Sequence, residues 1–237
     1  MRSLRWNATS RTGDGSARSP RRFTIAAAVL ISAAGLTFLP VTAASAAACG
    51  TPVPAGSNCT MTGTLTLTAG GLTLTAPASL SWAATLNGAN QSIVDVTAAD
   101  QQYTVNDGTG SGAGWHVSVS ATTFTNGSHT LPDTGTFVTT GSVTSISATA
   151  APTAACAAST TCTLPNNTTA YPVAITTAAS SPAAVTIYDT AAGTGVGQIV
   201  IGGSTAANPV GWWVNVPASA TAGAYTSTIT MAVVSAP

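Results

Sequence analysis

Hydrophobic and polar residues alternate clearly between Tyr103 and Ala121. A first strand leads into a turn at Asn106-Asp107-Gly108 and a glycine-rich loop, and a second strand then begins at Trp115. In the second strand one face carries Trp115, Val117 and Val119, and the other carries His116, Ser118 and Ser120. A period of two with β-branched residues on one face is typical of a half-buried strand, and glycines permit the positive φ angles of a tight reversal. The stretch therefore predicts a strand, a turn and a second strand.

The same alternation, separated by Gly, Pro and Asn turns, continues along the chain. It predicts strands within residues 64–68, 72–75, 76–86, 93–96, 137–138, 143–148, 171–176, 185–188, 198–201, 211–217 and 224–234. No segment shows helical periodicity, and the residues usual on helix surfaces are scarce. We expect an all-β fold, a single antiparallel β-sandwich or barrel-like domain. Residues 149–167, rich in Ala, Thr, Pro and Ser around two cysteines, are predicted to form a disulfide-pinned surface connection.

The amino terminus has the pattern of a secretory signal peptide. Six arginines precede an apolar run over residues 23–39, and Ala44-Ser45-Ala46 follows. The run is shorter than the roughly 20 residues that a membrane span needs. We predict cleavage after Ala46, leaving residues 47–237 as one exported domain with no membrane segment. Whether export follows the general or the twin-arginine route stays open, because Arg21-Arg22 is followed by a poor match to the twin-arginine motif.

Removal of residues 1–46 changes the charge of the chain. All six basic residues are arginines within that segment, and five of the six Asp lie beyond it. Residues 47–237 therefore have no Lys or Arg and a net charge of −5 with both His neutral. Without cations there is no counterion release, which excludes nucleic-acid binding, and attraction to anionic lipid fails for the same reason. A ligand must be held by stacking, apolar burial and neutral hydrogen bonds.

Four cysteines in an exported chain indicate disulfides. Three pairings are possible, and proximity in sequence favours Cys49–Cys59 and Cys156–Cys162. Zinc is the alternative, but the Cys-x5-Cys spacing suits it poorly.

Titratable groups that could support catalysis are few. The exported segment has two His, five Asp and four Tyr, and it lacks a Gly-x-Ser-x-Gly elbow. Asp95, Asp100 and Asp107 are the best calcium candidates, yet their spacing matches no known calcium loop, and turn formation explains Asp107. We expect no enzymatic activity, no cofactor and no metal.

Two tryptophans stand next to each other in a predicted strand. By alternation Trp212 and Trp213 point to opposite sides, and we expect Trp212 in the core and Trp213 exposed. An exposed Trp on a neutral surface can stack on sugar or anchor a protein partner. In the alternative, a loop or the Cys156–Cys162 segment covers Trp213.

Two motifs resemble the WxL-domain surface proteins of Gram-positive bacteria. The first runs from Val105-Asn106-Asp107 to Gly114-Trp115-His116-Val117, and the second is Trp212 to Pro217 followed by Gly223-Ala224-Tyr225. The likeness covers residues 61–237. Where the family has Leu two residues after Trp, this chain has Val117 and Val214, which keep an inward aliphatic side chain.

The resemblance implies non-covalent attachment to the cell wall, in particular peptidoglycan, and association with other surface proteins. We expect the ligand or partner to contact residues among Trp115, Trp213, Asp107, Asn106 and Asn215. Gly114, Trp212, Val117, Val214 and Tyr225 are expected to be structural. The first alternative is a structural subunit that self-associates through strand edges in a surface layer or fibre, and a remote one is a secreted hydrolase.

Overall fold

The computed structural model describes residues 47–235, so the predicted signal peptide lies outside the described residues. The chain divides into two compact units after Thr64. In the described part of the first unit, β1 (Ala47–Ala48) pairs in parallel with β2 (Cys59–Thr60). The Cys49–Cys59 disulfide closes the loop between them, as proximity in sequence predicted.

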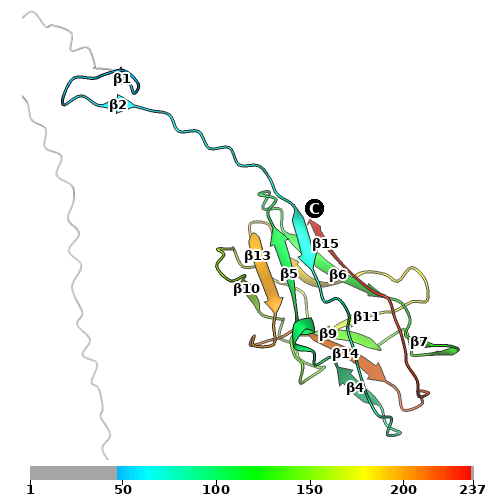
Figure 1. Ribbon diagram of the computed structural model, residues 1–237. Coiled ribbons are helices and arrows are strands. Elements are labelled where there is room, and N and C mark those ends of the chain that lie inside the picture. The colour runs from blue at the N-terminus through cyan, green and yellow to red at the C-terminus, as the bar shows by residue number, and fades with distance from the viewer. Residues whose placement is uncertain (1–46, 236–237) are drawn as a thin grey trace, which may run out of the picture. The chain divides into compact units, whose positions relative to one another are not determined.

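The second unit, residues 65–235, is an antiparallel β-sandwich built from three main sheets (Figure 1). One sheet has the order β10 (Ala154–Cys156), β13 (Gly197–Gly202), β5 (Gln102–Asp107) and β3 (Leu72–Thr75). Another has the order β11 (Val173–Ile175), β9 (Phe137–Thr140), β14 (Gly211–Val216) and β4 (Gln91–Val94). The third has the order β12 (Val185–Thr190), β6 (Trp115–Ala121) and β15 (Ile229–Ser235). A small hairpin of β7 (Thr125–Asn126) and β8 (His129–Thr130) and the 3₁₀ turn η1 (Ala98–Gln101) complete it.

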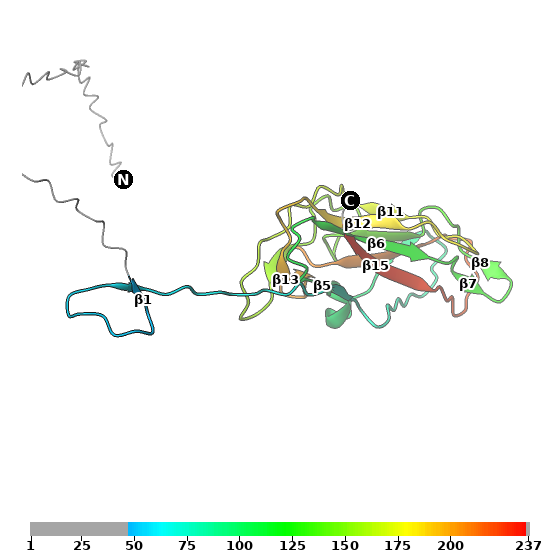
Figure 2. The ribbon, with the colours of Figure 1, turned by 90° about the horizontal axis from the view of Figure 1, so that it is seen from above.

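β6 is the central strand of its sheet, and it runs side by side with β12 and β15 (Figure 2). Trp115, Val117 and Val119 are fully buried, as the alternation predicted. The opposite face is not simply solvated, because Ser118 is also buried. The reason is that β11 packs near β6, and Thr122, just past the strand, forms a bridge to Ala178. The predicted half-buried strand is therefore covered on both faces over part of its length.

The core joins all three sheets through aromatic and branched aliphatic side chains. Trp212 of β14 stacks on Phe137 of β9 at a ring-centroid distance of 6.0 Å. Trp115 stacks on Tyr188 of β12 at 6.3 Å. Because the three sheets contribute to one cluster of buried residues, they fold as a unit around a single core.

Three predicted strands are absent. Residues 64–68, 76–86 and 143–148 contain no strand, although residues 72–75 do form β3. Leu65 and Leu67 are 81% and 84% exposed, so their alternation does not mark a buried face in this chain. Alternation shows that a segment can be a strand, but a strand also needs a partner edge, and these segments have none.

The predicted surface connection over residues 149–167 is pinned by the Cys156–Cys162 disulfide, as expected. It also contains β10, which pairs with β13 from Ala154↔Ile201 to Cys156↔Ile199. The sequence did not predict this strand, because Ala-rich segments have low β propensity. The disulfide therefore holds an edge strand of the sheet in addition to a loop.

Candidate functional site

Trp213 is only 6% exposed, so the prediction of an exposed Trp213 is wrong. Its indole N–H donates to the Ser142 carbonyl at 2.9 Å and contacts the Thr140 hydroxyl at 3.1 Å. The loop that follows β9 therefore covers this ring, and the Cys156–Cys162 segment is not what the indole bonds. Trp213 cannot stack on a ligand in this conformation.

Two further candidate residues are also buried. Trp115 is fully buried, and its indole N–H donates to the Gly195 carbonyl at 2.8 Å. Asp107 is 4% exposed, and its carboxylate accepts hydrogen bonds from the Thr109 backbone N–H at 3.0 Å and the Thr109 hydroxyl at 2.7 Å. This is the turn that the sequence predicted. Both side chains are therefore buried and bonded within the domain in this conformation.

The glycine-rich loop between β5 and β6 is closely tied to its surroundings. Gly108 exchanges hydrogen bonds with Gly70 and Gly71 at 2.7 and 3.1 Å. Gly112 accepts from Gly193 at 2.8 Å. At Gly114, with φ +83°, a Cβ would lie 2.5 Å from the Thr190 carbonyl oxygen. No side chain fits at Gly114 without a shift of its neighbours, and Val117, Trp212 and Val214 are buried. The structural role expected of these four residues stays a prediction.

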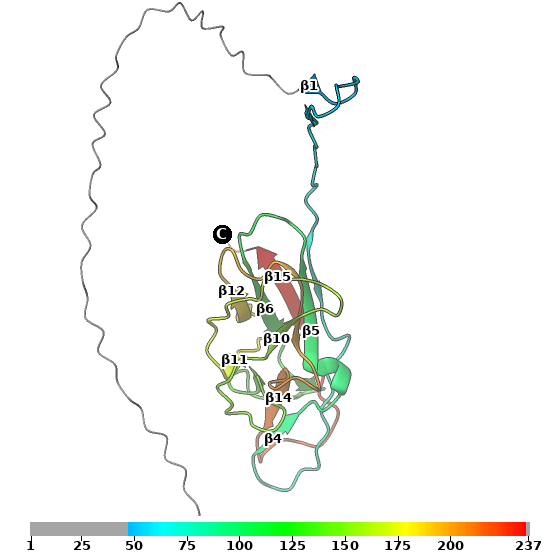
Figure 3. The same cartoon turned by 90° about the vertical axis from the view of Figure 1, so that its left-hand side faces the viewer.

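Asn106 and Asn215 remain accessible but lie on different sheets. Asn106 is exposed on β5, and Asn215 is half-buried on β14, opposite Ser92 of β4. β4 and β14 lie next to each other at one end of the second unit (Figure 3). The structure therefore does not bring the five predicted contact residues together.

Asn215 borders a shallow hollow of about 320 Å³ beside the β4–β14 pair. Its amide N–H donates to the Gly135 carbonyl at 2.7 Å, and its amide oxygen accepts from the Ser92 hydroxyl at 2.6 Å. The hollow is lined by Asn90, Gln91, Ser92, Pro132, Thr134, Gly135, Thr136, Asn215, Val216 and Pro217. None of these side chains is charged. The sequence could not single out the other members, because β4 and β14 meet only through long-range pairing.

Asp133 follows the hollow's Pro132 and is the nearest acid in sequence. Hydrogen bonds from the Thr123 and Thr177 hydroxyls, at 2.5 and 2.7 Å, hold the pKa of its carboxyl below the ordinary value. It is therefore a carboxylate at neutral pH, and its hydrogen bonds link the segments that contain Thr123 and Thr177. The electrostatic environment offers a ligand no cation to pair with.

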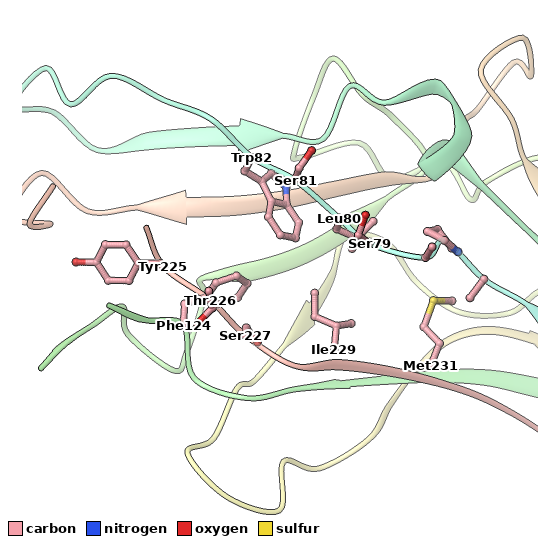
Figure 4. A pocket seen from close by; sticks show the side chains of 13 residues that line it. Ser79, Leu80, Ser81, Trp82, Phe124, Tyr225, Thr226, Ser227, Ile229 and Met231 are labelled. Carbon is pink, nitrogen blue, oxygen red and sulfur yellow. The ribbon is translucent and has the colours of Figure 1, made fainter. Parts of the chain in front are cut away.

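Two larger cavities, of about 600 and 650 Å³, share Trp82, Phe124 and Tyr225 in their linings. Trp82 donates its indole N–H to the Trp212 carbonyl at 2.9 Å and packs edge-on against Phe124 and Phe137. Figure 4 shows Trp82 pointing from one wall of the first cavity, with Ile229 and Met231 on the opposite wall. Tyr225, predicted to be structural, lines both cavities with its hydroxyl donating to the Thr221 carbonyl at 3.1 Å.

Within residues 47–235 no group of three or more His, Cys, Asp or Glu side chains is placed to hold a metal ion. Across the same range no helix has the length and apolarity needed to cross a bilayer.

The fold defines an all-β sandwich domain whose surface hollows present neutral groups. Comparison with protein families gives a match over residues 53–237 to the WxL domain, described as surface cell wall-binding. The chain therefore belongs to the WxL family of surface cell wall-binding domains, which indicates a location at the cell surface and cell wall. Searches of curated proteins and of solved structures returned no match.

Proposed function

We propose that this domain binds peptidoglycan glycan non-covalently and without catalysis, through the hollow beside Asn215. The observation that carries the proposal is the composition of that hollow, which is bordered by neutral amide, hydroxyl and backbone groups. Sugars carry many hydroxyl and amide groups that pair with such groups without any charge. The volume of about 320 Å³ is at the lower end of the usual range for small-ligand sites.

The absence of cations supports glycan over the anionic polymers of the wall. Residues 47–237 contain no Lys or Arg. An anionic polymer would meet a domain of net charge −5 and gain no ion pair. A neutral sugar backbone avoids this repulsion.

Asn215 is already oriented for the task by its two hydrogen bonds, to Ser92 and Gly135. The amide nitrogen of Asn215 can still donate a second hydrogen bond and its amide oxygen can still accept one, because an amide carries two donors and two acceptor lone pairs. A side chain fixed in this way loses little conformational entropy when a ligand binds.

The test is a pull-down of the mature protein with purified sacculi stripped of their anionic polymers. We expect stripped sacculi to retain the protein, and Asn215→Ala to weaken binding about 3- to 10-fold, as expected for one neutral hydrogen bond. Asn106→Ala, an exposed amide on another sheet, is the matched control and should bind as the unmodified protein does. Thermal unfolding of both variants separates lost contact from lost fold.

Loss of binding when the anionic polymers are removed would contradict the assignment of glycan. Equal binding by the Asn215→Ala and unmodified proteins would contradict the assignment of the hollow. A second candidate function is association with other surface proteins, and the exposed Leu65 and Leu67 favour it.

A further inference from the structure

We propose that residues 65–69 of one molecule insert as a β-strand into the cavity beside Trp82 of a second copy, which links molecules head to tail. This inference is independent of the glycan hollow. Two features of the chain carry it: an unpaired strand-like segment and a slot lined by both apolar and hydroxyl-bearing side chains, which matches the alternation of Leu and Thr in the segment.

The donor segment has the pattern of a strand but no partner. Leu65 and Leu67 are 81% and 84% exposed, with Thr66 and Thr68 between them. No main-chain hydrogen bond joins residues 65–69 to any other part of the described chain. The first such bond after Leu65 is the one from Gly70 to Gly108, in the loop between β5 and β6. Exposed alternating aliphatic residues with free backbone groups are the signature of an edge that pairs with another chain.

The acceptor slot lies between residues 76–82 and residues 225–231 (Figure 4). Ile229 and Met231 of β15 contribute apolar side chains from one wall, and Leu80 and Trp82 contribute from the other. The volume of about 600 Å³ falls in the range of cavities that enclose ligands. Two leucine side chains at alternate positions of a strand would meet these four apolar side chains, and the threonines between them would meet hydroxyl groups such as Ser79 and Ser81.

Both walls have unused backbone groups. Residues 76–80 make no main-chain hydrogen bond to another main-chain group within the described chain. β15 is the edge strand of its sheet, with β6 on its paired side. An unpaired edge next to a slot that can take alternate side chains is the arrangement that strand addition uses, with backbone bonds for affinity and side chains for specificity.

A molecule cannot fill its own slot with this segment in the arrangement observed. β3 is held by β5 from Leu72↔Asp107 to Thr75↔Thr104, and residues 65–69 precede its Leu72 end, whereas residues 76–82 of the slot follow its Thr75 end. Gly70 and Gly71, the two residues between the segment and β3, are bonded to Gly108, so the segment cannot fold back along β3 to reach the slot. The occupant is therefore a second copy, and because donor and acceptor are different surfaces, the contact does not close a dimer and extends into a chain.

The test is light scattering coupled to size-exclusion chromatography of the mature protein over a range of concentrations. We expect the mass to rise with concentration, and Leu65→Ser/Leu67→Ser to weaken association about 100-fold or more, because two aliphatic side chains lose their burial. Thr66→Ser/Thr68→Ser is the matched control and should associate as the unmodified protein does.

A second measurement tests the acceptor. A synthetic peptide of residues 64–71 should bind the Leu65→Ser/Leu67→Ser protein and change its tryptophan emission. Adding Trp82→Phe to that protein should reduce the change in emission. A monomeric unmodified protein at every concentration would overturn the proposal, as would association that survives the leucine substitutions. A peptide that fails to bind would also overturn it.

Discussion

Trp115→Ala is expected to lower the free energy of unfolding by about 3–5 kcal/mol, the usual cost of emptying a large aromatic site in a core. Trp115 is fully buried on the central strand β6 and stacks on Tyr188. Its removal leaves a cavity between β6 and β12, which pair with each other. A loss of this size is a large share of the stability of a typical domain.

The measurement is urea unfolding followed by circular dichroism. The midpoints of the variant and the unmodified protein are compared with the same dependence of the free energy of unfolding on urea concentration. Trp115→Phe is the matched control, because it keeps an aromatic ring but removes the indole N–H that bonds the Gly195 carbonyl. We expect a loss of about 1–3 kcal/mol for this variant, the cost of an unsatisfied buried acceptor and a smaller void. A midpoint for Trp115→Ala equal to that of the unmodified protein would contradict the assignment of Trp115 to the core.

Gly114→Ala is expected to destabilise the domain by about 2–5 kcal/mol, from a strained backbone together with a steric clash. Gly114 has φ +83°, and a Cβ there would lie 2.5 Å from the Thr190 carbonyl oxygen. Thr190 is held opposite Trp115 in the β12–β6 ladder, so neither strand can move away without breaking the pairing.

Gly112→Ala in the same loop separates the two causes. Gly112 also has a positive φ, +63°, but a Cβ there would meet no atom within 4 Å. We expect a cost of only about 1–2 kcal/mol, the backbone penalty alone. Thermal unfolding of both variants gives the comparison, and equal melting temperatures would show that the approach of Thr190 to Gly114 is not close.

The alternation of hydrophobic and polar residues correctly predicted those strands that find a pairing partner in the fold. The row Trp115, Val117 and Val119 is buried as expected, and both cysteine pairs are those favoured by proximity. Residues 65–67 alternate equally well and stay unpaired. The difference lies in tertiary context, because β propensity reflects packing against neighbours and the sequence does not display those neighbours.

The site was harder to predict than the fold. Alternation correctly placed Trp212 in the core, but it could not show that Thr140 at the end of β9 and Ser142 just past it bond the indole of Trp213, because they are 73 and 71 residues away in the chain. Asn215 was among the predicted contact residues, whereas its partner Ser92 is 123 residues away in the chain. The burial of Trp213 and the assembly of the hollow both depend on such long-range contacts.

The salt dependence of binding shows whether the domain holds the cell wall without ion pairs. The measurement is the dissociation constant of the mature protein on stripped sacculi between about 20 mM and about 1 M NaCl, over which charge interactions are progressively screened. Because residues 47–237 contain no Lys or Arg, we expect the constant to change by less than about twofold. A weakening of about tenfold or more with rising salt would show that ion pairs contribute to wall binding.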